Sequence, residues 1–101
     1  MTYRIDFKEA AQADLVALAK SEPKAFLKAQ ALIEELKIHP RTGTGKPEPL
    51  KGDHTGQWSR RITKKHRLVY EIHDTEVIVL CLLPTDIMRT SNILLFPSFP
   101  F

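Results

Sequence analysis

Three short segments with strand character constrain the fold of this chain most, because very little sequence separates them. They cover residues 57–63, 66–73 and 76–83, with two residues between one segment and the next. A parallel connection needs a crossover of about a dozen residues or more, so segments this close pair only as antiparallel neighbours. The sequence therefore predicts an antiparallel meander in the second half of the chain.

The N-terminal part predicts one strand followed by two helices. Residues 2–7 alternate between apolar and polar side chains, as a half-buried strand does, and residues 8–20 have helical spacing. Ser21 is expected to be the N-cap of a second helix, which has Pro23 in its first turn and runs to about Ile38. The apolar stripes of the two helices comprise Ala11, Leu15, Leu18, Phe26, Ala29, Ile33 and Leu36.

Residues 39–56 contain three prolines and four glycines, and they predict a loop without a regular element. The order of elements indicates an α+β fold, in which two N-terminal helices pack on one face of an antiparallel sheet. A chain of 101 residues is long enough for one such domain. We expect this domain to comprise residues 1–83, and residues 84–101 to form an atypical apolar tail.

Basic residues are concentrated in the middle of the chain. The net charge is +3, but residues 41–67 hold eight basic residues against two acidic ones. The basic residues are Arg41, Lys46, Lys51, Arg60, Arg61, Lys64, Lys65 and Arg67. This distribution favours a polyanionic partner, although a solvated basic loop and hairpin would have the same composition.

Glu48 is the sharpest candidate for a catalytic group. Pro47 and Pro49 flank it and restrict the backbone on both sides, and Lys51 and a basic hairpin follow. A lone carboxylate among fixed cations suits metal-free cleavage of RNA, in which the carboxylate takes the 2′-hydroxyl proton and the cations hold the phosphate. The alternative is a loop glutamate that only contributes to solubility.

Arg61 and Arg67 lie on two strands that flank a short turn, and their use depends on the pairing register. With a three-residue turn at residues 63–65 the two guanidinium groups share a face and lie nearly opposite each other. With a two-residue turn they face opposite sides. Like charges directly opposite destabilise a sheet, so such a pair is tolerated when it binds an anion. Each arginine alone could equally be a surface charge with its stem packed on the sheet.

The other side chains carry weaker signals. Trp58 could stack on a base, but strand alternation also allows a partly buried residue. Leu68, Tyr70 and Cys81 are most simply core residues. The four histidines lack metal-ligand spacing and no cofactor motif is present, so we expect neither a metal nor a cofactor. A single cysteine is typical of the cytoplasm, and no segment is long enough for a membrane span.

Three runs of sequence, from Gly45 to Lys51, from Trp58 to Thr63 and from His66 to Tyr70, resemble the YoeB/Txe branch of the RelE/ParE toxin superfamily. The resemblance covers about residues 2–83. It implies a RelE/ParE-type fold and a ribosome-dependent endoribonuclease, the toxin of a type II toxin–antitoxin system that cuts mRNA in the ribosomal A site. It also implies a cognate antitoxin, and family members often form homodimers.

The resemblance also implies roles for individual residues. Glu48 matches the family's general base, and Arg67 matches the arginine that stabilises the pentavalent phosphate, with help from Arg61 and Lys51. Lys65 stands where the family often has an acidic residue. The expected set of RNA- and phosphate-binding residues comprises Lys46, Lys51, Trp58, Arg60, Arg61 and Lys65.

The end of the chain departs from the family pattern. Family members end in a His-Tyr pair whose histidine protonates the leaving 5′-oxygen, whereas neither residue type occurs after His73 here. One set of codons for residues 84–92, read from its third base, encodes Tyr-Gly-His-Tyr-Glu-Asp-Lys and a stop. We infer that a frameshift replaced the catalytic terminus and left a folded but impaired toxin. The alternative is a natural extension with a role of its own.

Two rival functions fit the same fold. The missing histidine makes a non-catalytic module credible, one that binds an antitoxin or occupies the ribosome. A gyrase poison is disfavoured by the combination of Glu48 and Arg67. Ribosome binding without cleavage would indicate the first rival, and gyrase-dependent DNA breaks the second.

Overall fold

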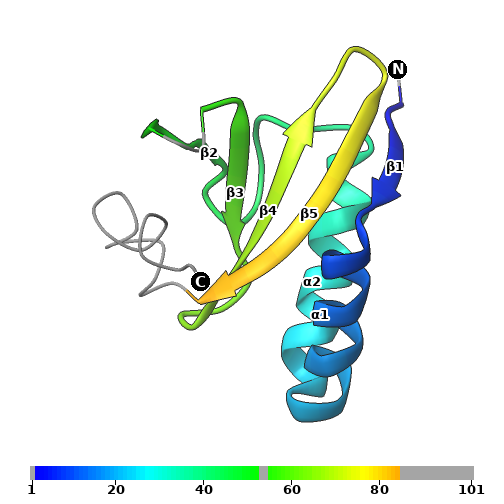
Figure 1. Cartoon of the computed structure of the whole chain (residues 1–101), viewed down its shortest axis with the longest axis vertical. Coiled ribbons are helices and arrows are strands. Elements are labelled where there is room, and N and C mark those ends of the chain that lie inside the picture. The colour runs from blue at the N-terminus through cyan, green and yellow to red at the C-terminus, as the bar shows by residue number, and fades with distance from the viewer. Residues whose placement is uncertain (1, 53–54, 85–101) are drawn as a thin grey trace.

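The computed structural model describes residues 2–52 and 55–84 of the chain (Figure 1). All the expected helices and strands are present, although their ends differ by a few residues. In chain order they are β1 (Arg4–Phe7), α1 (Glu9–Ser21), α2 (Pro23–Leu36), β2 (Glu48–Pro49), β3 (Gln57–Arg61), β4 (His66–Ile72) and β5 (Glu76–Pro84).

The five strands form one sheet in the order β1-β5-β4-β3-β2. The meander β3-β4-β5 is antiparallel, as the short turns predict, and β2 pairs antiparallel with β3. The expectation of a wholly antiparallel sheet is wrong for β1, which pairs parallel with β5 from Arg4 opposite Glu76 to Phe7 opposite Val79. The sheet is therefore mixed and mostly antiparallel. The connection between β1 and β5 contains both helices and strands β2, β3 and β4, so it is long enough for a parallel pairing.

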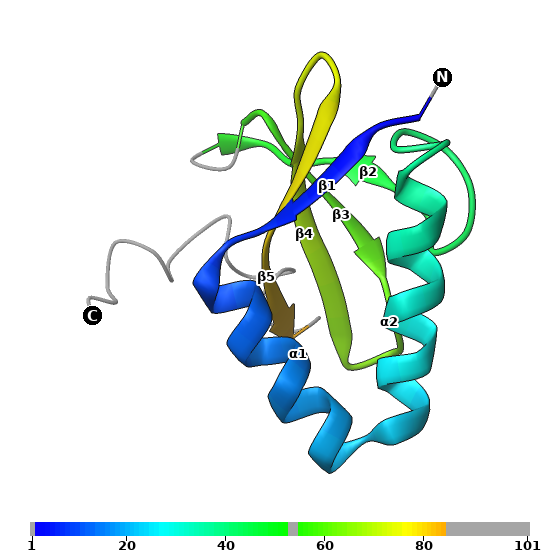
Figure 2. The same cartoon turned by 90° about the vertical axis from the view of Figure 1, so that its right-hand side faces the viewer.

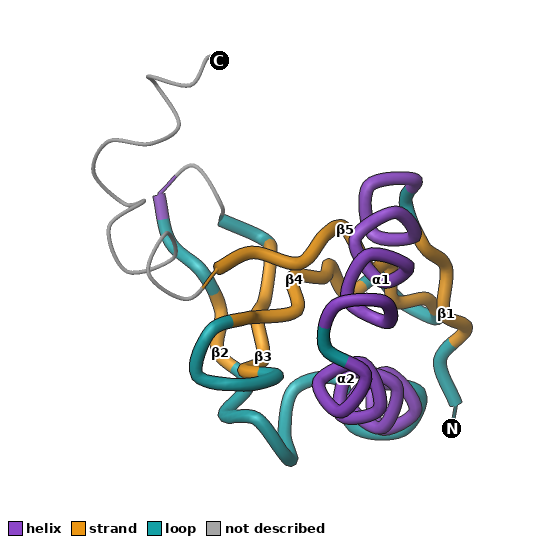
Figure 3. Tube along the Cα trace, turned by 90° about the horizontal axis from the view of Figure 1, so that it is seen from below, coloured by secondary structure: helices purple, strands orange, loops and turns teal. Residues whose placement is uncertain are grey.

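Helices α1 and α2 form an antiparallel pair joined at one end (Figure 2) and lie on the same side of the sheet (Figure 3). The predicted apolar stripes are confirmed, because five of their residues are buried and Leu15 and Phe26 pack against the buried cluster. Leu68 and Tyr70 are fully buried in the same core, as predicted. The buried residues of the helices are Ala11, Leu18, Ala25, Ala29, Leu32, Ile33 and Leu36.

The junction between the helices differs from the expected N-cap. Ser21 belongs to the last turn of α1, where its Oγ donates to the carbonyl oxygen of Ala17 at 3.0 Å. Its hydroxyl is therefore engaged within α1 and does not cap α2. Glu22 is the residue before α2 and makes no side-chain capping bond. Pro23 occupies the first turn, where its missing N–H costs nothing, as predicted.

The loop expected at residues 39–56 contains one short strand that the sequence did not predict. Strand β2 places Glu48 opposite Ser59 and Pro49 opposite Trp58. It forms the edge of the sheet, which is the position that a strand proline tolerates because one side needs no donor. The loop thus delivers Glu48 directly to the sheet.

Residues 85–101, and with them most of the predicted apolar tail, lie outside the described part of the chain. The division into a domain at 1–83 and a tail at 84–101 therefore stays a prediction. Neither helix in the described part has the length and apolar character needed to cross a membrane.

Leu32 provides a test of the packing between α2 and the sheet. Its side chain is 1% exposed, whereas that of Leu27 in the same helix is 63% exposed. We expect Leu32→Ala to lower the free energy of unfolding by about 2–5 kcal/mol, because it removes buried methyl groups and leaves a cavity. The matched control Leu27→Ala should cost less than about 1 kcal/mol. Urea unfolding measures both, and equal losses would contradict this packing.

Candidate active site

The two faces of β3 carry different chemistry. Arg61 lies opposite Arg67 and Ser59 lies opposite Val69, while Glu48 on β2 lies opposite Ser59. Directly paired residues share a face, so the carboxylate and the two guanidinium groups are on one side of the sheet. The register left open by the sequence is thus the one that places Arg61 and Arg67 together.

Glu48 and Arg67 form the centre of this face. Glu48 Oε1 lies 3.0 Å from Arg67 Nη2, and Arg67 Nε donates to Ser59 Oγ at 3.0 Å. The Arg67 side chain is 8% exposed and that of Glu48 is 59% exposed. A guanidinium held from two directions is a fixed donor, while the carboxylate beside it remains open to solvent and to a substrate.

The electrostatics of Arg67 reflect this partial burial. Burial lowers the pKa of the Arg67 guanidinium, the charge of Glu48 opposes that change, and the nearby charge of Arg61 adds to it. Two cations directly opposite each other repel, and one carboxylate compensates only part of that charge. The face is therefore suited to an anion such as a phosphate.

The three predicted lysines are exposed and lie in two different segments. Lys46 and Lys51 flank Glu48 in the loop, and Lys46 has a φ of 51°, in the left-handed region that lysine rarely adopts. Lys65 lies in the β3–β4 turn near Glu22. The pKa of Glu22 is lowered, mainly by its hydrogen bond with His66. Burial acts to raise this pKa, and the charge of Lys65 acts to lower it. Among the described residues, no hydrogen bond or ion pair joins these lysines to the Glu48–Arg67 pair, so their role in RNA binding stays a prediction.

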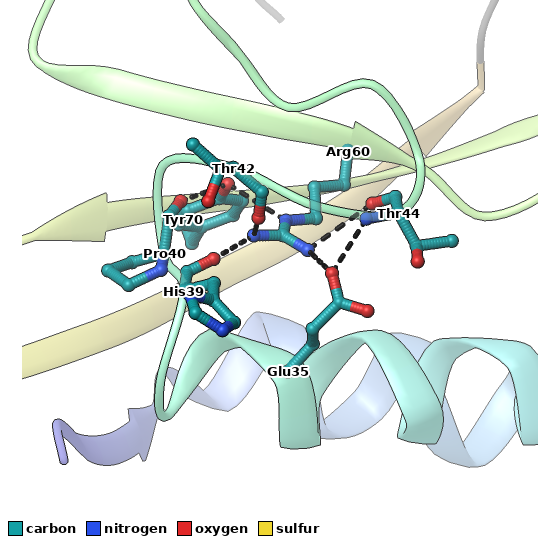
Figure 4. A network of polar contacts seen from close by, with 7 residues as sticks. All are labelled: Glu35, His39, Pro40, Thr42, Thr44, Arg60 and Tyr70. Atoms are coloured by element: carbon teal, nitrogen blue, oxygen red, sulfur yellow. Dashed lines mark hydrogen bonds and ion pairs between the residues drawn. The ribbon is translucent and has the colours of Figure 1, made fainter.

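Arg60 has a different environment from its neighbour, and the structure contradicts its assignment as a phosphate-binding residue. It is fully buried on the helix side of the sheet, and all five of its N–H groups have acceptors (Figure 4). Its partners are Glu35 Oε1 at 2.6 Å, Tyr70 Oη at 3.2 Å, and the carbonyl oxygens of Thr42 at 2.7 Å, Thr44 at 3.2 Å and His39. No donor remains for an external anion.

The partners of Arg60 are themselves satisfied. Glu35 Oε1 also accepts from the backbone N–H of Thr44 at 2.7 Å, and the Tyr70 hydroxyl donates to the carbonyl oxygen of Pro40 at 2.8 Å. Burial acts to raise the pKa of Glu35, but the hydrogen bonds from Thr44 and Arg60 and the charge of Arg60 outweigh it and lower that pKa. Burial raises the pKa of Tyr70 against the influence of Arg60. We call Arg60, Glu35, Tyr70 and these backbone groups the Arg60 network.

Trp58 also lies on the helix side of β3. It pairs with Tyr70 and packs, half-buried, against the hydrophobic core. The alternative of a partly buried strand residue therefore describes its position, on the face opposite to the Glu48–Arg67 pair. A stacking role for Trp58 has no support from this placement.

Cys81 was expected in the core, and it is half-buried on β5 without belonging to the buried cluster. Burial, and then the charge of Asp14, raise the pKa of its thiol to about 11. Such a thiol is almost entirely protonated near neutral pH and a poor nucleophile. Within residues 2–52 and 55–84, no three His, Cys, Asp or Glu side chains are grouped as metal ligands.

Sequence reasoning missed Ser59 and Glu35. Ser59 is two residues from Arg61, so strand alternation could have placed it on the same face once the register was known. Glu35 has no such signal, because a glutamate at the margin of a helix stripe is most often a solvated charge. Its buried partner is distant in sequence.

Comparison with known proteins places this chain and its fold among bacterial toxins. The family described as YoeB-like toxin of bacterial type II toxin–antitoxin system matches residues 7–83. Toxin YoeB of Streptomyces coelicolor is 43% identical over 77 residues, which cover 76% of this chain and 92% of the relative. Toxin RelK of Mycobacterium tuberculosis is 41% identical over 76 residues, covering 75% and 89%.

Solved structures of YoeB toxins also match the fold of this chain. A YoeB/ParE toxin from Agrobacterium tumefaciens superimposes with a TM-score of 0.75 and 34% identity, covering 80% of this chain and 96% of that one. The toxin in a YoeB–YefM complex from Staphylococcus aureus gives a TM-score of 0.72 and 31% identity, covering 82% and 97%. The family match and the fold thus define a toxin of a type II toxin–antitoxin system. The chain belongs to the YoeB-like family of these toxins.

Glu35 makes stability depend on pH in a defined direction. Its pKa in the folded protein is below the usual 4.5, so the unfolded chain binds the proton more readily. The stability that the carboxylate contributes is present above about pH 4.5 and is lost as pH falls through the lowered folded-state pKa. We expect Glu35→Gln to be less stable at neutral pH and to lose less stability than wild type between about pH 5 and pH 3.

Urea unfolding at several pH values measures this difference. Glu34→Gln is the control, because Glu34 is an exposed neighbour in the same helix that contacts Lys37 and not the Arg60 network. Parallel pH profiles for wild type and Glu35→Gln would contradict the described role of Glu35.

Proposed function

We propose that this toxin is built as an endoribonuclease that cleaves mRNA without a metal ion. The observation that carries the proposal is the exposed Glu48 carboxylate 3.0 Å from the buried, Ser59-anchored guanidinium of Arg67, with Arg61 opposite on the same face. A base next to fixed cations is what internal transesterification of RNA requires.

The reaction begins when Glu48 takes the proton of a ribose 2′-hydroxyl. The 2′-oxygen attacks the adjacent phosphorus, and the charge that develops on the pentavalent phosphate is stabilised by Arg67, with Arg61 and Lys51 assisting. The bond to the 5′-oxygen then breaks, which gives a 2′,3′-cyclic phosphate and a 5′-hydroxyl end. Because the contact with Arg67 uses Oε1, the second carboxylate oxygen of Glu48 is available to the hydroxyl.

The leaving 5′-oxygen needs a proton, and this chain lacks the residue that supplies it in the family. No histidine or tyrosine follows His73 in the sequence. Loss of a general acid typically costs about 10²–10⁴ in rate, so the given chain is expected to fold and to cleave RNA very slowly. The frameshift reading of residues 84–92 accounts for the loss.

The expected partners follow from the family. The relatives from Staphylococcus aureus include a YoeB–YefM complex and a YoeB dimer. By analogy this chain binds a cognate antitoxin in the cytoplasm, acts on mRNA in the ribosomal A site, and is able to form a homodimer. A non-catalytic module that binds the antitoxin or the ribosome is the second candidate, and the missing histidine is the observation that favours it.

The test compares cleavage of ribosome-bound mRNA by the given chain and by a version rebuilt after Leu83 with Tyr-Gly-His-Tyr-Glu-Asp-Lys. The rebuilt chain is expected to cut faster by about 10²–10⁴. In the rebuilt chain, Glu48→Gln should lose a similar factor and Arg67→Lys about 10²–10³, because the lysine ammonium lacks the planar fork with which Arg67 contacts Ser59 and Glu48 from two different nitrogens. Glu9→Gln, an exposed change at the start of α1, is the control.

Equal rates for the given and rebuilt chains would show that the terminal histidine is dispensable and that the assigned general acid is wrong. If both chains bind the ribosome but neither cleaves mRNA, the non-catalytic binding module becomes the favoured function. Full cleavage activity of the Glu48→Gln variant would show that Glu48 is not the general base.

A further inference from the structure

The loop that carries Glu48 to the sheet edge is held from the side of the sheet opposite to the catalytic pair. Arg60 and Tyr70 bind four of its backbone carbonyl groups, and Glu35 accepts from one of its N–H groups. The four carbonyl groups belong to His39, Pro40, Thr42 and Thr44 (Figure 4). The start of the loop is therefore fixed by side chains that do not touch the substrate face.

The middle of the loop approaches both α2 and β3 closely. Gly43 has a φ of +115°, and a Cβ there would lie 2.0 Å from Glu35 Oε1. Gly45 has a φ of +87°, and a Cβ there would lie 2.8 Å from the carbonyl oxygen of Arg61. The Gly45 carbonyl also accepts from the backbone N–H of Arg61 at 2.7 Å. Only two residues separate this contact from Glu48.

Strand β2 is very short. It has two residues, Glu48 paired with Ser59 and Pro49 paired with Trp58, and Pro49 has no N–H to donate. Just after the strand, the N–H of Leu50 donates to the carbonyl oxygen of Gln57 at 2.8 Å. Because the paired segment is so short, the preceding loop also contributes to the position of the Glu48 carboxylate.

We propose that Arg60 is a positioning residue, which acts through the Arg60 network to hold the 39–45 loop and so places Glu48 beside Arg67 on the opposite face of the sheet. The catalytic meaning of this role rests on the proposed nuclease function. The placement of Glu48 does not, and it can be observed in a chain that cuts nothing. A purely structural Arg60 would instead affect stability and leave the native Glu48–Arg67 pair unchanged.

Tyr70→Phe tests the proposal without removing the buried charge. The ring stays in the core, but the hydroxyl that links Arg60 to the carbonyl oxygen of Pro40 is lost. Tyr3→Phe is the matched control, because its hydroxyl contacts the same loop only through the side chain of Arg41, at 3.4 Å. Glu35→Gln is a second variant, which keeps an acceptor oxygen and decides the question if Tyr70→Phe does not fold.

The readout is the Nε–H signal of Arg67 in the ¹H–¹⁵N NMR spectrum of the full chain. Glu48→Ala gives the position of this signal when the pair is absent. We expect Tyr70→Phe and Glu35→Gln to move the signal towards that position, and Tyr3→Phe to leave it in place. When Glu48→Ala is already present, Tyr70→Phe should no longer move it, since the positioned partner is gone.

An Arg67 signal at the wild-type position in the folded Tyr70→Phe and Glu35→Gln proteins would overturn the proposal, whatever happens to their melting temperatures. Cleavage of mRNA by the rebuilt chain provides a second test, independent of the NMR measurement. There, Tyr70→Phe should lower kcat about tenfold or more with little change in KM, because the base is misplaced. If the rebuilt chain does not cut, the proposed function fails, while the NMR result still decides the role of Arg60.

Discussion

The ion pair between the buried Arg60 and the partly buried Glu35 is the interaction on which the rest of the structure depends. It lies where α2, β3 and the loop before β2 meet, and Arg60 uses all five N–H groups there. Removing one partner of a buried ion pair leaves an uncompensated charge and typically costs about 3–5 kcal/mol. The carbonyl groups of the loop would lose their donor as well. The chain thus retains a buried charge where most proteins place an apolar side chain. This charge holds the backbone of the loop in one conformation through its carbonyl groups.

Two adjacent arginines on β3 lie on opposite faces of the sheet, because successive side chains of a strand point to alternate sides. Arg60 is buried beneath the loop, and Arg61 lies opposite Arg67 beside the candidate base. The same strand contributes Ser59, which orients Arg67. Strand β3 therefore connects the support of the loop on one face with the candidate phosphate site on the other. A slip of one residue in its register would exchange the two arginines and remove both features.

The sequence predicted what depends on local periodicity. The apolar stripes of α1 and α2 and the meander β3-β4-β5 follow from spacing and short turns. The parallel pairing of β1 with β5 was missed because it joins residues about 70 positions apart, and no local pattern encodes such a contact. Glu48 and Arg67 were proposed from the local sequence and family resemblance, and the structure brings the two side chains together. Arg60 was misplaced because charge alone does not distinguish a buried arginine from a phosphate ligand, and its partner Glu35 is on a distant helix.

We propose that the face holding Glu48, Arg61 and Arg67 cleaves RNA through the substrate's own 2′-hydroxyl. The most direct test of this proposal uses the rebuilt chain and ribosome-bound mRNA with a single 2′-deoxy nucleotide at the position that is cut. We expect the deoxy message to be bound but not cleaved there, and the unmodified message to give a 2′,3′-cyclic phosphate end. Cleavage of both messages at the same rate would contradict it, because the nucleophile would then not be the 2′-oxygen.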